Sequence, residues 1–207
     1  METILHYFPD LTEKQQQQFA ALDKIYAEWN ARINVISRKD ISNLYVNHVL
    51  HSLSIALFLK PVEGTTFIDI GTGGGFPGVP LAILLPHCDF MLIDRIRKKI
   101  TVVDAVSKEL GLENVTTFAG DLGECHRKFD FAVSRAVMPM PDLVKIARKN
   151  IARKKTRNLY SNGIVALKGG DLSAELAGLS VPFFEENLSV WFKEPYFETK
   201  SLIYVPV

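Results

Sequence analysis

The chain has 207 residues, which is enough to bury one sizeable core but short for two full enzymatic domains. Hydrophobic residues make up 47% and charged residues 23%, which excludes a disordered chain and a collagen-like fibre. The formal net charge is only +1, so binding of nucleic acid would require the positive charges to be concentrated in patches of the surface.

The amino terminus and the apolar stretches predict a cytoplasmic protein without a membrane segment. The first residues have neither a basic region nor a cleavable apolar core, so we expect no secretory signal. The longest apolar stretches, 52–59 and 79–85, are less than half of the roughly 20 residues that a spanning helix needs. Cys88 and Cys125 lack the CxxC spacing of a zinc or redox site, and we expect two reduced thiols.

The first third of the chain predicts helices. Thr12 followed by Gln15 fits a capping box, and apolar residues at helical spacing come directly after it. A second helical stretch is expected over 41–59, because a proline and a glycine follow it closely. We therefore predict a helical extension over residues 1–62, attached to a ligand-binding domain over residues 63–207.

From residue 66 onward, short apolar runs alternate with amphipathic segments, which is typical of a parallel sheet with crossover helices. The expected strands are 67–70, 90–94, 115–118, 129–134 and 164–168, and the expected helices are 79–85, 98–110, 142–153 and 171–179. Two further runs, 188–192 and 201–205, alternate like strands of an antiparallel hairpin. The fold class predicted is therefore α/β, with a mostly parallel sheet and an antiparallel carboxyl-terminal hairpin.

A glycine-rich loop predicts a ligand site. The segment 67–78 is an apolar strand that continues into glycines and then into a helix. Gly71, Gly73 and Gly75 would let a ligand approach the backbone and would permit positive φ angles. Such a loop lies at the carboxyl ends of parallel strands, where ligands bind near the topological switch point.

Two aspartates favour S-adenosylmethionine as the ligand. Asp94 closes the next strand, where its carboxylate suits the hydroxyl groups of a ribose. Asp69 stands where a carboxylate could organise waters or the ammonium of the methionine part, whereas negative charge beside a pyrophosphate is unfavourable. Pro77 and Pro80 also remove backbone donors that a pyrophosphate would need. A dinucleotide site and a tight turn without a ligand remain as alternatives.

Several motifs together resemble the glucose-inhibited division protein B family of 16S ribosomal RNA guanine-N7 methyltransferases. The resemblance extends from Trp29 to Lys168. The motifs are Trp29-Asn30 with Asn34, His48-Val-Leu-His-Ser52, Gly71-Thr-Gly-Gly-Gly-Phe-Pro-Gly-Val-Pro-Leu81, Ser134-Arg135-Ala136 and Leu167-Lys168-Gly169.

The resemblance implies a Rossmann-like class I methyltransferase domain after a helical extension. It also implies that the cofactor is held by Gly71, Phe76, Leu122, Gly123 and Arg135. Three positions depart from the family pattern, which has aspartate at the place of His51, a basic residue at Asp121 and glutamate at Gly123. Gly123 could still offer its backbone N–H to adenine.

Guanine N7 carries a lone pair and no proton, so the expected reaction needs no general base. Catalysis would rest on holding N7 in line with the methyl group, which can contribute about 7 to 11 kcal/mol. We expect Arg135 to contact the cofactor and to present its fork to guanine O6 or a phosphate. Lys168, at the end of the fifth strand, is expected to face the site. His48 and His51 lack a third ligand, so no metal is expected.

RNA contacts are expected from two basic clusters. Residues 143–170 contain no acidic residue, and their best phosphate-binding candidates are Arg153, Lys154, Lys155 and Arg157. A second cluster, which includes Arg95, Arg97 and Lys98, directly follows Asp94. A solvated basic helix face and loop is the alternative. The expected partner is 16S ribosomal RNA or the small ribosomal subunit, and the expected state is a monomer.

Three other classes of function remain open from the residues alone. They are a methyltransferase of a small molecule or protein, a nicotinamide-dependent oxidoreductase and an RNA-binding module without activity. The last of these would leave the glycine loop without a role.

Overall fold

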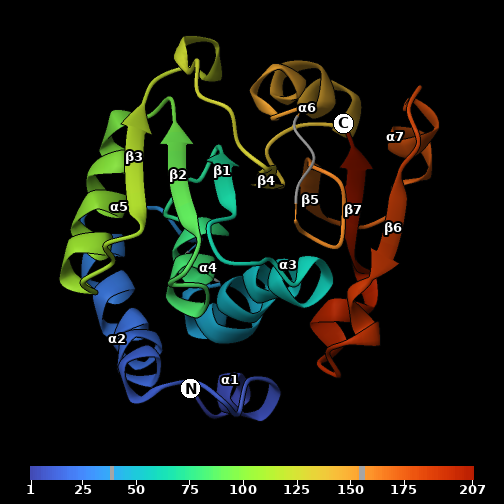
Figure 1. The fold of residues 1–207 in the computed structure, drawn as a ribbon. Helices are drawn as coiled ribbons and strands as arrows, with labels where there is room; N and C mark the ends of the chain where they lie inside the picture. The colour runs from blue at the N-terminus through green and yellow to red at the C-terminus, as the bar shows by residue number, and fades with distance from the viewer. Residues whose placement is uncertain (38–39, 154–156) are drawn as a thin grey trace.

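The computed structural model describes residues 1–37, 40–153 and 157–207 (Figure 1). One sheet of seven strands crosses the molecule in the order β3-β2-β1-β4-β5-β7-β6. Five strands are parallel: β1 (Thr66–Ile70), β2 (Asp89–Asp94), β3 (Val115–Ala119), β4 (Phe131–Arg135) and β5 (Gly163–Gly169). The antiparallel strands are β6 (Phe184–Asn187) and β7 (Lys200–Pro206). The predicted fold class is confirmed.

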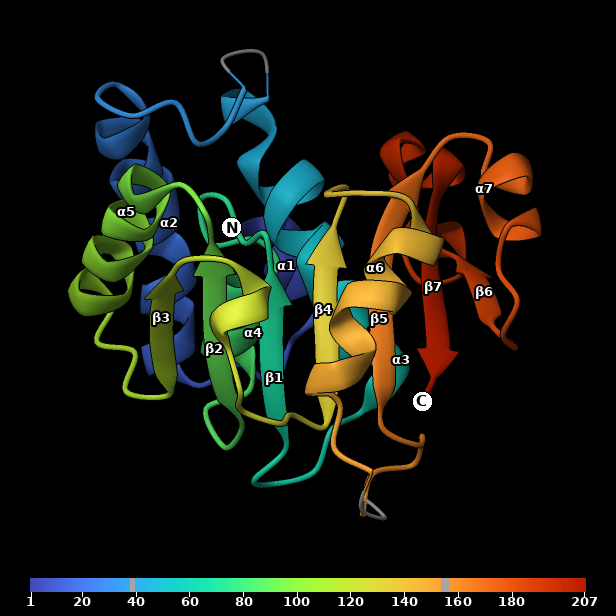
Figure 2. The ribbon, with the colours of Figure 1, turned by 90° about the horizontal axis from the view of Figure 1, so that it is seen from above.

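Helices cover both faces of the sheet (Figures 1 and 2). One face carries α1 (Glu2–Tyr7), α2 (Glu13–Asn30), α3 (His51–Leu59), α4 (Gly78–Leu84) and α5 (Arg97–Glu109), and the other carries α6 (Met140–Ala147) and α7 (Ser173–Ala177). Alternate strand residues fill the two cores. In β1, for example, Phe67 packs with the first group of helices and Ile68 with the second, as the period of two along a strand requires.

The helical extension shares its core with the sheet. Phe19 and Leu22 of α2 are fully buried in the same apolar cluster as the strand residues. The Gln18 amide donates to the Leu110 carbonyl over 2.8 Å, and the Tyr26 hydroxyl donates to the Gly74 carbonyl over 2.6 Å. The capping box of Thr12 is present as predicted. The extension is therefore a wall of the domain rather than a separate body.

The helix expected over 41–59 is divided into three. A 3-10 turn at Ile41–Asn43 leads into a π-helix at Leu44–Leu50, and α3 follows. At the junction the His51 N–H donates to the carbonyls of Val46 and His48. The wider turn leaves the Asn47 carbonyl to other partners, described below.

The strand expected over 188–192 is wrong. The strand β6 lies just before it, and a 3-10 turn at Leu188–Val190 follows. The Asn187 side chain starts this turn by accepting the Ser189 N–H over 2.9 Å. Leu188 and Phe192 are fully buried whereas Val190 is 59% exposed, and because a strand would place all three on one face, this pattern suits a helical turn. Among the described residues, no helix is long and apolar enough to cross a membrane.

Candidate functional site

A cavity of about 570 Å³ opens at the carboxyl ends of β1, β2 and β4. It lies where the order of parallel strands reverses between β1 and β4, which is the position expected for a ligand in an open α/β sheet. Six of the predicted cofactor residues line it: Gly71, Gly73, Phe76, Asp94, Leu122 and Arg135. The other three, Asp69, Gly75 and Gly123, lie outside the lining.

The glycine loop closes one side of the cavity. Gly71, Gly73 and Gly75 have φ angles of +69°, +59° and +101°, in the region that side chains rarely adopt. A Cβ added at Gly71 would stand 2.7 Å from a methyl group of Val137, which follows β4. The glycines therefore permit both the loop conformation and its close approach to the neighbouring chain.

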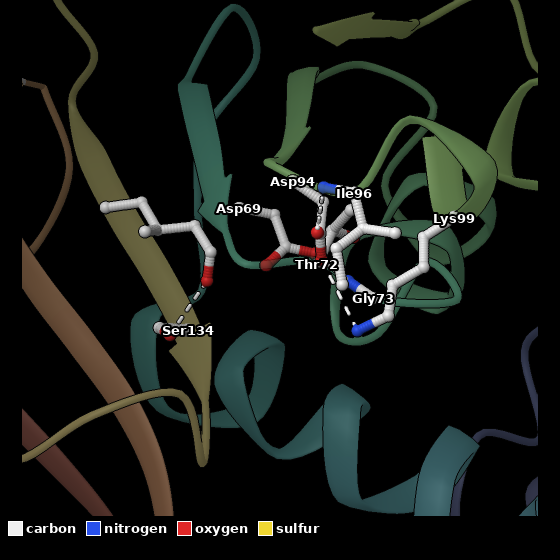
Figure 3. A network of polar contacts seen from close by, with 8 residues as sticks. Asp69, Thr72, Gly73, Asp94, Ile96, Lys99 and Ser134 are labelled. Atoms are coloured by element: carbon white, nitrogen blue, oxygen red, sulfur yellow. Dashed lines mark hydrogen bonds and ion pairs between the residues drawn. The ribbon is translucent and has the colours of Figure 1, made fainter. Parts of the chain in front are cut away.

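Asp69 organises the loop from behind (Figure 3). One carboxylate oxygen accepts the Thr72 hydroxyl over 2.6 Å and the Gly78 N–H over 2.8 Å. The other oxygen is buried and has no hydrogen-bond partner among the described residues. Burial raises the pKa of Asp69 to about 7. This carboxylate lies beneath the loop rather than beside the ligand, where the sequence predicts it.

Asp94 joins the loop to the next helix. One oxygen accepts the Gly73 N–H over 3.0 Å, and the other accepts the Ile96 N–H over 2.8 Å. The Lys99 ammonium lies 3.9 Å from the same carboxylate (Figure 3). Unlike Asp69, Asp94 lines the cavity, and a carboxylate has lone pairs beyond the two used by the backbone.

Arg135 extends from β4 across the cavity. Its guanidinium carbon lies 5.2 Å from the centre of the Phe76 ring. One nitrogen donates to the Asn47 carbonyl over 3.2 Å, and another lies 2.8 Å from His48 Nδ1. Burial and the nearby guanidinium lower the pKa of His48 to about 4, so its ring is neutral near pH 7 and can accept this hydrogen bond. No carboxylate among the described residues forms a salt bridge with Arg135.

Lys168 lies outside the cavity, contrary to expectation. Its ammonium forms a salt bridge of 2.7 Å with Glu175 in α7 and also donates to the Met138 carbonyl. The same Glu175 oxygen accepts the Met140 N–H over 2.7 Å. Lys168 and Glu175 therefore hold the segment after β4 in place, and three residues of this segment, Ala136, Val137 and Met138, line the cavity.

The turn after β3 differs from expectation at Gly123. Its N–H donates to Asp121 over 2.7 Å and is therefore already used, although it was predicted to be free for adenine. Asp121 also forms a salt bridge of 2.5 Å with Arg95, whose side chain lines the cavity. Asp121, which departs from the family pattern, thus binds both the backbone of the turn and the Arg95 side chain at the rim of the cavity.

The two predicted RNA-binding clusters lie at opposite ends of the parallel strands, one after the carboxyl end of β2 and one before the amino end of β5. Arg95 follows β2 and lines the cavity, whereas Arg97 and Lys98 lie outside its lining, at the start of α5. Arg153 and Arg157 belong to the connection that enters β5 at its amino end, where Arg157 donates to the Glu63 carbonyl over 3.4 Å (Figure 2). The other two members, Lys154 and Lys155, lie outside the described residues.

Sequence reasoning missed Val35, which lines the cavity from the loop after α2. The Asn30 side chain holds that loop by accepting the Val35 and Ile36 N–H groups over 2.8 and 2.9 Å. Asn30 had been singled out only through the family resemblance. An asparagine at the end of a helix that precedes an irregular loop is the local signal for such a role.

The cysteines and His51, which could in principle serve redox or metal chemistry, lie in surroundings typical of structural residues. Cys88 and Cys125 are buried free thiols, as expected. Burial lowers the pKa of His51, whose Nδ1 lies 3.2 Å from the Tyr196 hydroxyl. Among the described residues, no group of three or more histidines, cysteines and acids could hold a metal ion.

Comparison with known proteins identifies the family. A family model described as rRNA small subunit methyltransferase G (GidB) matches residues 15–190. The chain is 53% identical over 204 residues to the ribosomal RNA small subunit methyltransferase G of Bacteroides thetaiotaomicron, covering 99% of this chain and 98% of that protein. The protein belongs to the methyltransferase G family. Its identity to the relative from Parabacteroides distasonis is 54% over 202 residues, covering 97% and 87% of the two chains.

Solved structures agree with the fold of a methyltransferase G family member. A SAM-dependent methyltransferase from Aquifex aeolicus has a TM-score of 0.57 at 14% identity, covering 82% of this chain and 98% of that chain. A mutant of MtNAS in complex with S-adenosylmethionine also has a TM-score of 0.57 at 14% identity, covering 93% and 76%. The family match spans most of α2 together with strands β1 to β6, in accord with the core that α2 shares with the sheet.

Proposed function

We propose that this protein transfers the methyl group of S-adenosylmethionine to N7 of a guanine in 16S ribosomal RNA. It would act as a cytoplasmic monomer on the RNA or on the small ribosomal subunit. Membership of a family named for methylation of small-subunit rRNA supports the reaction. The observation that carries the proposal is the glycine-lined cavity at the switch point of the sheet.

The cavity residues fit S-adenosylmethionine. The volume of about 570 Å³ lies within the range of about 300 to 1,000 Å³ of small-molecule sites. We assign Gly71, Gly73 and Phe76 to the wall that the cofactor approaches, and Gly75 to the conformation of the loop behind that wall. Asp94 would accept hydrogen bonds from the ribose, while the adenine would lie beside Leu122 and Gly123, with apolar contact rather than the Gly123 N–H holding it. Asp69 would support the loop without touching the cofactor.

The chain's own chemistry in this reaction is positioning. When bound, S-adenosylmethionine supplies a methyl group on a sulfonium centre, which the N7 lone pair can attack without loss of a proton. Among the described residues that line the cavity, Asp94 is the only carboxylate, and two backbone N–H groups hold it. Arg135, fixed by Asn47 and His48, would direct its remaining donors to guanine O6 or to a phosphate.

The catalytic assignment therefore concentrates on Arg135. Lys168 would act indirectly, because its ammonium is occupied by Glu175 and Met138. Arg95, Arg97 and Lys98 would contact phosphates near the cavity, since Arg95 lines it and the other two are exposed at the adjoining start of α5.

The test is methylation of small ribosomal subunits from cells that lack the enzyme, followed by mass-spectrometric mapping of the RNA. We expect N7-methylguanosine at one guanine. Arg135→Gln should lower kcat/KM by about 10- to 100-fold, because hydrogen bonds from a charged donor are worth about 1.5 to 3 kcal/mol. Lys108→Gln, an exposed change on α5, is the control. Unchanged N7-methylguanosine content with the wild-type enzyme would refute the proposal.

A further inference from the structure

A second hollow, which we call the basic pocket, lies on the α6 side of the molecule. It has a volume of about 460 Å³ and is lined by Lys128, Arg148, Lys149, Ile151 and Arg153. All four basic residues are exposed. None of its described lining residues is shared with the cavity at the glycine loop.

The wall of the basic pocket is a rigid piece of backbone. Asn150 is 1% exposed, and its amide donates to the carbonyls of Cys125 and Arg127 over 2.8 and 3.0 Å. Phe129 and Ile151 form a parallel β-bridge, in which backbone N–H groups donate across over 2.8 Å in both directions. These bonds join the chain before β4 to the turn after α6. The four cations are therefore presented by a preorganised surface rather than by a free loop.

In the described part of the chain, the four basic residues of the pocket form no salt bridge, and Asp121 is the carboxylate that interacts electrostatically with Lys149. Among the described residues, no carboxylate lies within 4.0 Å of its lysine and arginine nitrogens. Residues 143–170 contain no acid at all. The Lys128 ammonium donates to the carbonyl of Lys149, which holds two of the cationic residues together. Like charges gathered in this way repel one another, so an anionic ligand would relieve an unfavourable arrangement.

A chain of contacts links the basic pocket to the cavity. The Lys149 ammonium donates to the Gly123 carbonyl over 3.3 Å, and Gly123 follows Leu122, a lining residue of the cavity. The Gly123 N–H binds Asp121, which pairs with Arg95 on the cavity rim. Basic side chains therefore lie at both ends of this path, Arg95 at the rim of the cavity and Lys149 at the basic pocket, with the turn after β3 between them.

We propose that the basic pocket binds backbone phosphates of the same ribosomal RNA whose guanine enters the cavity, as a second anchor remote from the reaction. This inference rests on the proposed function. The described lining contains no aromatic residue on which a base could stack, so the contact is with phosphates and independent of sequence. The basic segment recognised in the sequence thus acts through Arg148, Lys149 and Arg153, away from the methyl-transfer site.

The experiment measures binding rather than methyl transfer. A variant with Lys128, Arg148, Lys149 and Arg153 changed to Gln is compared with a control of equal charge change. The control replaces four exposed lysines elsewhere by Gln: Lys14, Lys24, Lys108 and Lys193. The dissociation constant for unmethylated small subunits is measured across a range of salt concentrations, and again for deproteinised small-subunit rRNA.

We expect the pocket variant to bind both RNA substrates at least about 10-fold more weakly at 0.1 M salt. Its salt dependence should fall by about 0.7 to 0.9 in slope for each lost phosphate contact. Affinity for S-adenosylhomocysteine should equal that of the control when only Arg148 and Arg153 are changed, because the contact of Lys149 with Gly123 then stays intact. Arg148→Gln with Arg153→Gln forms a milder second variant, because neither side chain donates a hydrogen bond recorded among the described residues.

Binding and salt slope equal to those of the control would overturn the inference. A loss confined to assembled subunits would also overturn it, in favour of contact with a ribosomal protein. Failure of the proposed function is seen separately, as wild-type enzyme that binds subunits yet adds no methyl group to guanine N7.

Discussion

Asp69 is a buried carboxyl group with a pKa of about 7, well above its ordinary value of 3.8. Because the folded protein binds this proton more tightly than the unfolded chain, protonation of Asp69 stabilises the fold. That contribution is fully present below about pH 4 and is lost as the pH rises through about 7. Ionisation of Asp69 beneath the glycine loop thus lowers the free energy of unfolding near neutral pH.

Replacing Asp69 with Asn removes this titration while keeping an oxygen for Thr72 and Gly78. We expect the free energy of unfolding of Asp69→Asn, relative to wild type, to increase with pH by at most about 1.4 kcal/mol per unit and to level off above pH 7. Urea unfolding of both proteins from about pH 5 to pH 8 tests this. His48 and His51 titrate in the opposite sense, but they are present in both proteins and cancel. A difference independent of pH would contradict the prediction.

Lys168 and Glu175 give a second prediction at the residue scale. Lys168→Met should lower the free energy of unfolding by about 2 to 3 kcal/mol, because Glu175 loses a charged partner. The segment after β4 would loosen, so KM for the cofactor should rise more than kcat falls. Glu175→Gln should show the same pattern. A loss of kcat alone in Lys168→Met, with Glu175→Gln normal, would indicate that Lys168 touches the substrate after all.

Among the elements, the glycine loop depends on space as well as on conformation. Gly71→Ala combines a positive φ angle with a clash against Val137, whereas Gly111→Ala has a similar φ of +63° and no atom within 4 Å of the new Cβ. We expect Gly71→Ala to weaken cofactor binding by at least about 10-fold, and both variants to lose about 1 to 2 kcal/mol of stability from backbone strain. Calorimetric titration with S-adenosylhomocysteine, beside urea unfolding, separates the effects. Equal cofactor affinities would contradict the steric argument.

The strands of the parallel sheet were predictable because their apolar runs are local signals. The π-helix at Leu44–Leu50 could not be predicted from local signals. Its Asn47 carbonyl accepts hydrogen bonds from Arg135 and from the Tyr196 hydroxyl, which are both distant in sequence. Likewise, the topology correctly predicts Lys168 at the carboxyl end of β5, but it does not predict to which face of the sheet the side chain points. Neighbouring strand residues point to opposite faces, and Leu167 packs against the α2 to α5 side while Lys168 reaches α7.

At the scale of the molecule, the helical extension completes the ligand site. Tyr26 holds the Gly74 carbonyl, and Val35 lines the cavity. We therefore predict that the fragment 63–207 does not fold alone, because removal of α1, α2 and α3 exposes the apolar surface that they cover on one face of the sheet, where only α4 and α5 remain. Circular dichroism and denaturant unfolding of the isolated fragment would test this. A cooperative transition in the fragment would show instead that the extension is dispensable for folding.

The strand β7 lies between β5 and β6, although it follows both in the chain. In the described part of the sheet, β6 pairs with β7 and has no other neighbour. The strand β6 can therefore join the sheet only when residues 200–206 are available. A chain that lacks those residues would expose the edge of β5 to pairing with other chains.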